Sequence, residues 1–326
     1  MPILELDRVR VSISRKDGTE VLPVREASLT VEAGRTLALV GESGCGKSMT
    51  CLAVAGLLPH RARLCAGTLR LDGTDMASLP PAEAFDLRRR AVASVFQDAS
   101  GSLNPVRSIG WQIAEAMRLR RGATQAEAWS EAVRLLGRVG IASPEARARD
   151  YPHRFSGGMN QRAMIALAIA GRPRLLIADE ATTALDVTIQ AQILDLITDL
   201  QAEIGMAVLL VTHDLGVVAR AADDVAVMYA GRVVERAALR DLFADPRHPY
   251  TQGLLGARPR ADVTAARLVT IDGAVPPLDA MPPGCAFAPR CARADLACDR
   301  QEPAAAREGP GHFVACLKPG AARIAA

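Results

Sequence analysis

The stretch TLALVGESGCGKSMTCLAVAGLL, residues 36–58, decides the fold. Residues 36–40 predict a short buried strand, and the periodic apolar residues after Lys47 predict a helix that ends near Gly56. Glycines between the two let backbone N–H groups converge on an anion at the start of the helix. The stretch therefore predicts a phosphate-binding loop between a strand and a helix.

The residues of this loop suit a nucleotide and its metal ion. Lys47 can supply a positive charge to the terminal phosphates, and Ser48 can supply a hydroxyl to Mg²⁺. A tight glycine-rich turn with an incidental Lys-Ser pair is the alternative, which only the rest of the chain can exclude. The residues predicted to bind the nucleotide and Mg²⁺ here are Gly41, Ser43, Gly44, Cys45, Gly46, Lys47, Ser48 and Met49.

Two adjacent carboxylates follow a second apolar strand in RPRLLIADEATTALD, residues 172–186. The carboxyl ends of parallel strands open onto the ligand crevice of a sheet, so Asp179 can reach Mg²⁺. Glu180, one residue further, can polarise an attacking water as a general base. Acids also favour ordinary helix N-termini, and this pair alone would fit that reading equally well.

A second anion site is predicted in HRFSGGMNQRAMIALAIAG, residues 153–171. Ser156 precedes a helix whose free N–H groups and positive dipole end point beyond the serine. One chain cannot easily use two such sites on one nucleotide. The economical arrangement is two chains packed head to tail, each lending this helix to the nucleotide of the other.

Five motifs in this order, GESGCGKS, FSGGMNQR, ADE, TTALD and VTHD, resemble the ATP-binding subunit of ABC transporters. The resemblance implies an α/β P-loop NTPase with a RecA-like core, a β-subdomain and a helical signature subdomain over about residues 100–170. It implies a nucleotide-binding domain over residues 1–240, with ATP and Mg²⁺ as cofactors.

The same resemblance implies a role for each further position. Gln97 in SVFQD is similar to the glutamine that touches Mg²⁺ or the attacking water. His213 looks like the histidine that holds the γ-phosphate and orients Glu180, and Asp186 looks like the acid at the dimer seam. The residues expected to act on the partner's ATP are Ser156, Gly157, Gly158 and Gln161.

The sequence departs from the family where adenine is usually stacked on an aromatic ring, because no Phe, Tyr or Trp precedes Phe85. Arg15, Lys16 or aliphatic atoms near Val21 and Leu22 are the alternatives.

A proline-rich, loop-rich extension is expected over residues 241–326. SLNP at 102–105, HPYTQGLL at 248–255 and the cysteine-bearing segment 284–316 look like the ATPase subunits of oligopeptide and dipeptide importers. The cysteine-bearing segment lies more than sixty residues beyond His213 and has no phosphate-binding group of its own. We therefore expect it to act apart from ATP chemistry.

Four cysteines of the extension, spaced C-x₅-C-x₆-C-x₁₇-C, predict a metal site. Disulfides are disfavoured in a reduced compartment, and the spacing matches neither the usual zinc knuckles nor the common ferredoxin patterns. Residue chemistry leaves the metal open. The resemblance implies a [4Fe-4S] cluster, with zinc as the alternative, on the ligands Cys285, Cys291, Cys298 and Cys316.

The function implied is ATP hydrolysis that drives peptide uptake from the cytoplasmic face of the inner membrane. The expected partners are a second ATPase chain, a paralogue forming a heterodimer, two transmembrane permease subunits and, indirectly, a periplasmic or extracellular substrate-binding protein. Nickel or oligosaccharide import is the alternative within this architecture, and a soluble ABC ATPase outside transport is the alternative beyond it.

Composition is consistent with this reading. No apolar run reaches the roughly 18 to 20 residues that span a bilayer, and the N-terminus is polar within its first eight residues, so we expect no membrane span and no signal peptide. A net charge of +3 with 3% aromatic residues gives no basic, ring-lined surface for nucleic acid.

Overall fold

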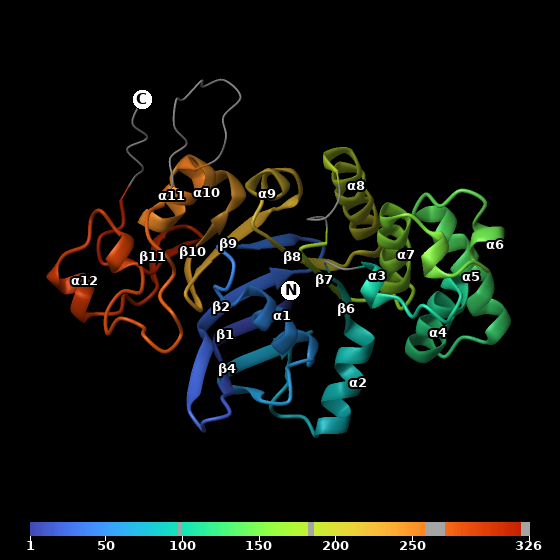
Figure 1. The fold of residues 1–326 in the computed structure, drawn as a ribbon, viewed down its shortest axis with the longest axis horizontal. Helices are drawn as coiled ribbons and strands as arrows, with labels where there is room; N and C mark the ends of the chain where they lie inside the picture. The colour runs from blue at the N-terminus through green and yellow to red at the C-terminus, as the bar shows by residue number, and fades with distance from the viewer. Residues whose placement is uncertain (97–98, 182–185, 258–270, 321–326) are drawn as a thin grey trace. The chain divides into compact units, whose positions relative to one another are not determined.

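The computed structural model describes residues 1–96, 99–181, 186–257 and 271–320 (Figure 1). The chain forms two compact units. Unit 1 comprises Met1–Glu5, Val31–Thr36 and Arg70–Val211. Unit 2 comprises Leu6–Thr30, Leu37–Leu69 and Thr212–Ala326.

Three parallel strands form the sheet of unit 1, in the order β8 (Ala207–Thr212), β7 (Leu175–Asp179) and β6 (Val92–Val95). The first four residues of β7 are at most 1% exposed. A run that is buried on both faces is typical of a central parallel strand, because helices or loops cover both sides of such a sheet. The strand predicted before Asp179 is confirmed.

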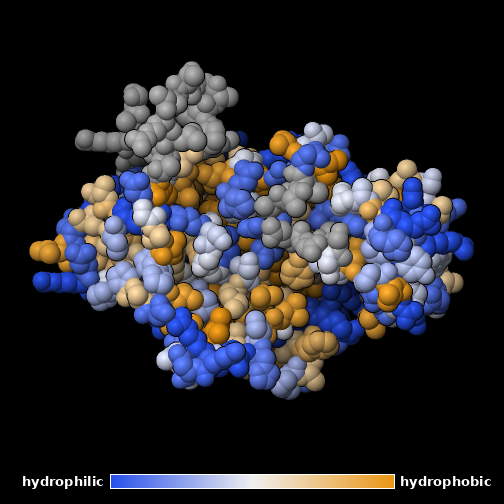
Figure 2. Space-filling view, in the orientation of Figure 1, coloured by the Kyte–Doolittle hydropathy of each residue, from blue (hydrophilic) through white to orange (hydrophobic). Residues whose placement is uncertain are grey.

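Helices make up most of unit 1, and Figure 1 shows α4 to α7 grouped together. Helix α5 begins with a capping box in which Thr124 and Glu127 satisfy each other's backbone donors. The surface around α5 and α6 is mainly hydrophilic in Figure 2. The other elements of unit 1 are β5 (Thr74–Asp75), α2 (Pro81–Ala91), α3 (Ala99–Ser102), α4 (Ile109–Arg121), α5 (Gln125–Arg138), α6 (Pro144–Arg147), the 3₁₀ turn η1 (Pro152–Arg154), α7 (Gly157–Ile169) and α8 (Val187–Ile204).

Unit 2 contains a mixed sheet with the strand order β4-β1-β2-β10-β9-β3. Strand β3 pairs in parallel with β9, and β9 pairs antiparallel with β10. The predicted strand and helix on either side of the phosphate loop are confirmed as β3 and α1. The bounds are β1 (Pro2–Ser14), β2 (Glu20–Glu32), β3 (Thr36–Val40), α1 (Lys47–Ala55), β4 (Ala62–Leu71), α9 (Leu215–Ala221), β9 (Asp224–Tyr229) and β10 (Arg232–Ala238).

The segment that follows β10 returns to the sheet. Strand β12 pairs antiparallel with β10, and β11 pairs with β12. Although the sequence suggested mainly loops here, short helices and a hairpin are present. The elements are α10 (Leu239–Ala244), α11 (Pro249–Gly256), the 3₁₀ turn η2 (Ala288–Arg290), α12 (Leu296–Arg300), β11 (Ala306–Gly309) and β12 (His312–Val314).

One buried carboxylate joins this segment to the sheet. Glu235, on β10, is 1% exposed and accepts hydrogen bonds from the backbone N–H groups of Arg247 at 2.7 Å and His248 at 2.9 Å. Its Oε1 also lies 2.8 Å from Nε2 of His312 on β12. Strand β10 is therefore tied through a single side chain to two separate parts of the extension.

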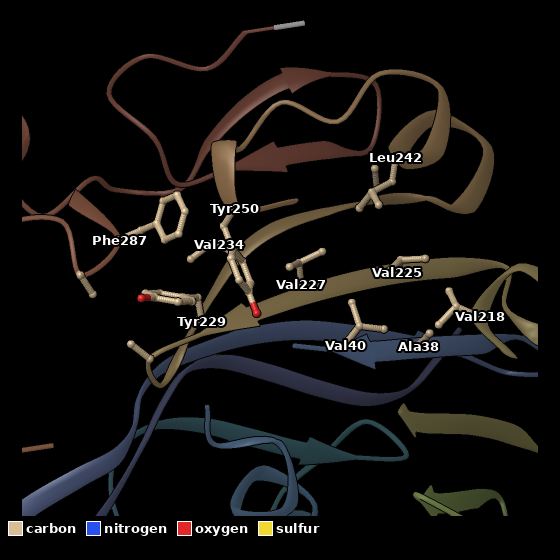
Figure 3. Close-up of a cluster of buried hydrophobic side chains, with 13 residues drawn as sticks. Ala38, Val40, Val218, Val225, Val227, Tyr229, Val234, Leu242, Tyr250 and Phe287 are labelled. Carbon is tan, nitrogen blue, oxygen red and sulfur yellow. The ribbon is translucent and has the colours of Figure 1, made fainter. Parts of the chain in front are cut away.

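Apolar side chains of β3, β9 and β10 pack against the extension in the core of unit 2 (Figure 3). The ring of Tyr250, on α11, lies 4.6 Å from that of Tyr229 on β9, and Phe287 lies 5.2 Å from Tyr229 in an edge-on arrangement. Such aromatic pairs contribute about 0.5–1.5 kcal/mol each beyond the area they bury. The extension thus shares its core with the strands next to the phosphate loop.

Replacing the buried carboxylate should loosen the extension. We expect Glu235→Ala to lower the free energy of unfolding by at least about 2 kcal/mol, because two buried backbone donors each lose an acceptor worth about 1–3 kcal/mol. Glu308→Ala, which removes an exposed carboxylate from β11, is the matched control. Denaturant unfolding measures the difference; equal stability of the two variants would contradict the role given to Glu235.

Candidate functional site

The phosphate loop turns where only glycine fits. Gly41 has φ of 156°, and a Cβ there would lie 2.2 Å from the carbonyl oxygen of Met228. Gly46, with φ of 106°, leads directly into α1, and a Cβ there would lie 2.5 Å from the carbonyl oxygen of Pro23. The loop is therefore pressed against β9 and β2, which fixes its path between strand and helix.

Lys47 is held inside the loop. Its side chain is 6% exposed, and its ammonium group donates to the carbonyl oxygens of Gly41 at 2.7 Å and Glu42 at 3.0 Å. The Cys45 thiol lies beside it at 3.7 Å, and burial raises the pKa of that thiol. The buried ammonium is thus anchored at the start of α1, where the helix dipole also favours an anion.

The other predicted loop residues differ in solvent exposure. Ser43, Gly44 and Ser48 are exposed, whereas Met49 is partly buried and Cys45 is fully buried. The exposed Ser48 hydroxyl is available to a metal ion. The Cys45 side chain is buried, so Cys45 can contribute only its backbone to a ligand. All eight predicted loop residues, Lys47 among them, lie in unit 2.

The predicted acids of unit 1 stand at the carboxyl end of β7. Asp179 is its last residue, and Glu180 follows with φ of 48°, a left-handed conformation that is uncommon for a residue other than glycine. The Glu180 N–H donates to the Val211 carbonyl at 2.9 Å, which fixes this turn. Strained backbone of this kind concentrates at functional sites. Gln97 lies outside the described residues.

The N-terminus of α7 is exposed, as an external anion would require. Ser156 is the N-cap, and its hydroxyl accepts from the Met159 N–H at 3.3 Å. Gly157 is exposed, and a Cβ there would meet nothing within 4 Å, whereas Gly158 is partly buried. Gln161 is 2% exposed, so its side chain is not available at this end of the helix.

Two further predicted residues lie at helix starts: Asp186 is a helix cap, and His213 immediately precedes one. Asp186 is exposed and caps α8 by accepting from the Ile189 N–H at 2.9 Å. His213 is exposed directly after β8 and precedes Asp214, the N-cap of α9. Arg15, one alternative for holding adenine, donates to Asp279 of the extension at 2.9 Å.

The four extension cysteines line one small cavity. All are free thiols, and burial raises the pKa of the Cys285 and Cys316 thiols. The Lys318 N–H donates to the Cys316 sulfur at 3.3 Å. Within residues 1–96, 99–181, 186–257 and 271–320, no group of three or more His, Cys, Asp or Glu side chains is arranged to hold a metal ion.

The extension contacts the phosphate loop, which the sequence did not indicate. The Glu42 N–H donates to the Tyr250 hydroxyl at 2.9 Å, and Arg290 donates to the Glu42 carboxylate at 3.0 Å. HPYTQGLL and GCAFAPRC marked both residues in the sequence, but no pattern there indicates that they meet the second residue of the loop.

Comparison with known proteins decides the family. Residues 24–183 match the model described as ABC transporter, and residues 234–298 match the model described as oligopeptide/dipeptide transporter, C-terminal region. The oligopeptide transport ATP-binding protein OppD of Salmonella typhimurium is 46% identical over 97% of this chain and 94% of its own. This chain belongs to the ABC transporter ATP-binding proteins.

Further similarities agree with this assignment. The dipeptide transport ATP-binding protein DppD of Bacillus subtilis is 44% identical over 96% of this chain and 94% of its own. A dimeric ATP-binding cassette, solved in a post-hydrolysis state with ADP and Pi, matches with a TM-score of 0.65 and 26% identity over 73% of this chain and 99% of its own. The α/β P-loop NTPase fold and the ATPase activity predicted from the sequence are confirmed.

None of the helices in the described part of the chain is long and apolar enough to cross a membrane.

Proposed function

We propose that this chain is the ATP-hydrolysing subunit of an importer that brings di- or oligopeptides across the cytoplasmic membrane. The observation that carries this proposal is similarity to peptide-transport proteins along 97% of the chain, together with the match of residues 234–298 to the oligopeptide/dipeptide transporter C-terminal region. The chain would bind the cytoplasmic side of two permease subunits, which receive substrate from a binding protein outside the membrane.

Each residue of the ATP site has a distinct task in this proposal. Lys47 and the loop N–H groups hold the phosphates, while Ser48 and Asp179 hold Mg²⁺. Glu180 accepts a proton from the attacking water. The strained backbone of Glu180 supports this assignment, because such strain is concentrated at functional sites. His213 and Gln97 would contact the γ-phosphate and the metal-bound water.

Glu180→Gln should separate binding from hydrolysis. The amide keeps the size of the side chain but cannot accept the proton, so we expect ATP turnover to fall about 10²- to 10⁴-fold while ATP still binds. Peptide uptake by the assembled importer should stop with it. Glu145→Gln, which removes an exposed carboxylate from α6, is the control. Normal turnover by Glu180→Gln would refute the general-base role, and normal hydrolysis without peptide uptake by the native complex would refute the transport proposal.

Two ATPase chains packed head to tail form the next part of the proposal. The α7 N-terminus would approach the γ-phosphate bound by the partner chain, which we expect to be a paralogue. Support comes from the exposed Ser156 and from Gly157, where no described residue lies within 4 Å of the place that a Cβ would take. A helix N-terminus with free N–H groups favours such an anion.

Ser156→Arg tests this arrangement. The bulky side chain should block the approach of the partner's phosphate, so we expect hydrolysis at the partner's site to fall while ATP binding to this chain's own loop remains. Ser130→Arg, at an exposed position of α5, controls for the added charge. The variants are mixed with a partner chain, and hydrolysis is followed in complexes that retain only the partner's phosphate loop. Undiminished hydrolysis there would exclude shared sites.

A [4Fe-4S] cluster held by Cys285, Cys291, Cys298 and Cys316 is the last part of the proposal. One cavity is lined by all four cysteines, which suits a group that binds four thiolates. Four thiolates suit either a cluster or zinc, and the resemblance of the cysteine-bearing segment to that of the peptide importers is the reason to prefer the cluster. When bound, the cluster would neutralise four thiolate charges and stabilise the extension.

Protein purified without oxygen should be brown and contain about four irons per chain. Replacing any one of the four cysteines by Ser should abolish the colour and lower the stability of the extension, because the remaining thiolates lose their common partner. Cys65→Ser, at an exposed cysteine outside the cavity, should change neither. Metal analysis decides between the alternatives: one zinc per chain, or no metal at all, would rule out the cluster.

A further inference from the structure

The backbone N–H and the carboxylate of Glu42 are both hydrogen-bonded to the extension. Its backbone N–H donates to the Tyr250 hydroxyl at 2.9 Å, and its carboxylate accepts from Arg290 at 3.0 Å. Glu42 is the second residue of the phosphate loop, and its carbonyl oxygen accepts from Lys47 at 3.0 Å. Displacing Glu42 would therefore move an acceptor of the lysine that binds the phosphates.

Arg290 is fixed by several contacts of its own. Its side chain is 5% exposed, and it donates to the carbonyl oxygens of Asp272 at 2.9 Å and Ile271 at 3.1 Å. The guanidinium lies 5.8 Å from the ring centre of Tyr229 and 6.0 Å from that of Phe287. Because these contacts leave the Arg290 side chain few rotamers, the guanidinium also restricts the position of the Glu42 carboxylate to which it donates.

Tyr250 is equally confined. It is fully buried between Tyr229 and Phe287, with ring centres 4.6 and 5.4 Å away, and Figure 3 shows its hydroxyl directed away from Phe287. This packing fixes the position of the Tyr250 hydroxyl oxygen beside the phosphate loop. A charged donor, Arg290 on η2, and a neutral acceptor, the Tyr250 hydroxyl on α11, thus restrain Glu42 from two elements of the extension.

The same elements border the cysteine cavity. Arg290 immediately precedes Cys291, and Phe287 lines the cavity together with Cys285 and Cys291. A change in the fold around the cysteines would therefore displace Phe287 and Arg290, and through them Glu42.

We propose that Arg290 and Tyr250 are positioning residues for the phosphate loop: by holding Glu42 they keep the loop in its anion-binding shape, so that the fold of the cysteine segment sets the affinity for MgATP. Because such coupling is reciprocal, MgATP also stabilises the cysteine segment. The proposal rests on ATP binding by the loop and is independent of the transported substrate and of the metal.

Arg290→Gln in the full-length chain provides the test. We expect the affinity for MgATP, measured with a fluorescent ATP analogue, to fall roughly tenfold, the effect of losing one charge-assisted hydrogen bond of about 1.4 kcal/mol. In the assembled complex the KM for ATP should rise by a similar factor while kcat at saturating ATP changes less than about twofold. Arg290→Lys should restore part of the affinity, and Tyr250→Phe should lower it by a smaller factor.

Arg300→Gln, at an exposed arginine on α12, is the matched control and should bind MgATP normally. The double variant Glu42→Gln/Arg290→Gln should bind no more weakly than Arg290→Gln alone, because both changes break the same contact. A folded Arg290→Gln with native MgATP affinity would overturn the proposal, even if its melting temperature were lower. If Arg290→Gln does not fold, Glu42→Gln tests the same contact from the other side. Native MgATP affinity of Glu42→Gln would also overturn the proposal.

Discussion

A loop can bind phosphate through its backbone only if its path is fixed, and in this chain close contact between main-chain segments fixes that path. Gly41 and Gly46 approach the carbonyl oxygens of Met228 and Pro23 so closely that no side chain fits between them. The loop therefore has the shape that β9 and β2 impose. Any constraint on these strands is a constraint on the nucleotide site.

The extension supplies such constraints at three levels. Glu235 ties β10 to the backbone after it, and β10 in turn pairs with β9. Tyr250 and Phe287 pack against Tyr229, the last residue of β9. Arg290 reaches the loop itself. Since the loop, the strands and the extension share one core, the extension is better described as part of the nucleotide-binding unit than as an appendage.

Sequence predicted the parts of this structure that depend on local patterns. The strand before Gly41, the helix after Lys47 and the strand before Asp179 follow from apolar runs bounded by glycine or charge, and the structure confirms them. The family's ordered motifs predicted the fold class, which no single motif could do. Local physics decided these features because each depends on residues close together in the chain.

Contacts between distant residues escaped prediction. Glu42 and Arg290 lie 248 residues apart, and nothing in GESGCGKS or GCAFAPRC shows that one will meet the other. The strand β12 was missed because His312–Val314 is too short for a periodicity to be visible. It pairs with β10 at Glu235 and Arg236, beyond the residue where β10 pairs with β2. Tertiary pairing, not propensity, decides such segments.

At Gly157, by contrast, no contact among the described residues explains why the residue is glycine. A glycine is less favourable in a helix than alanine, by up to about 1 kcal/mol, and no neighbour within 4 Å of the expected Cβ excludes a side chain here. Gly41 and Gly46 owe their identity to contacts inside unit 2. Gly157, exposed beside the serine cap of α7, has no such contact among the residues that the structure describes. A helix end without a side chain at this position leaves its N–H groups open to an anion, which is the geometry that the proposed sharing of sites between two chains requires.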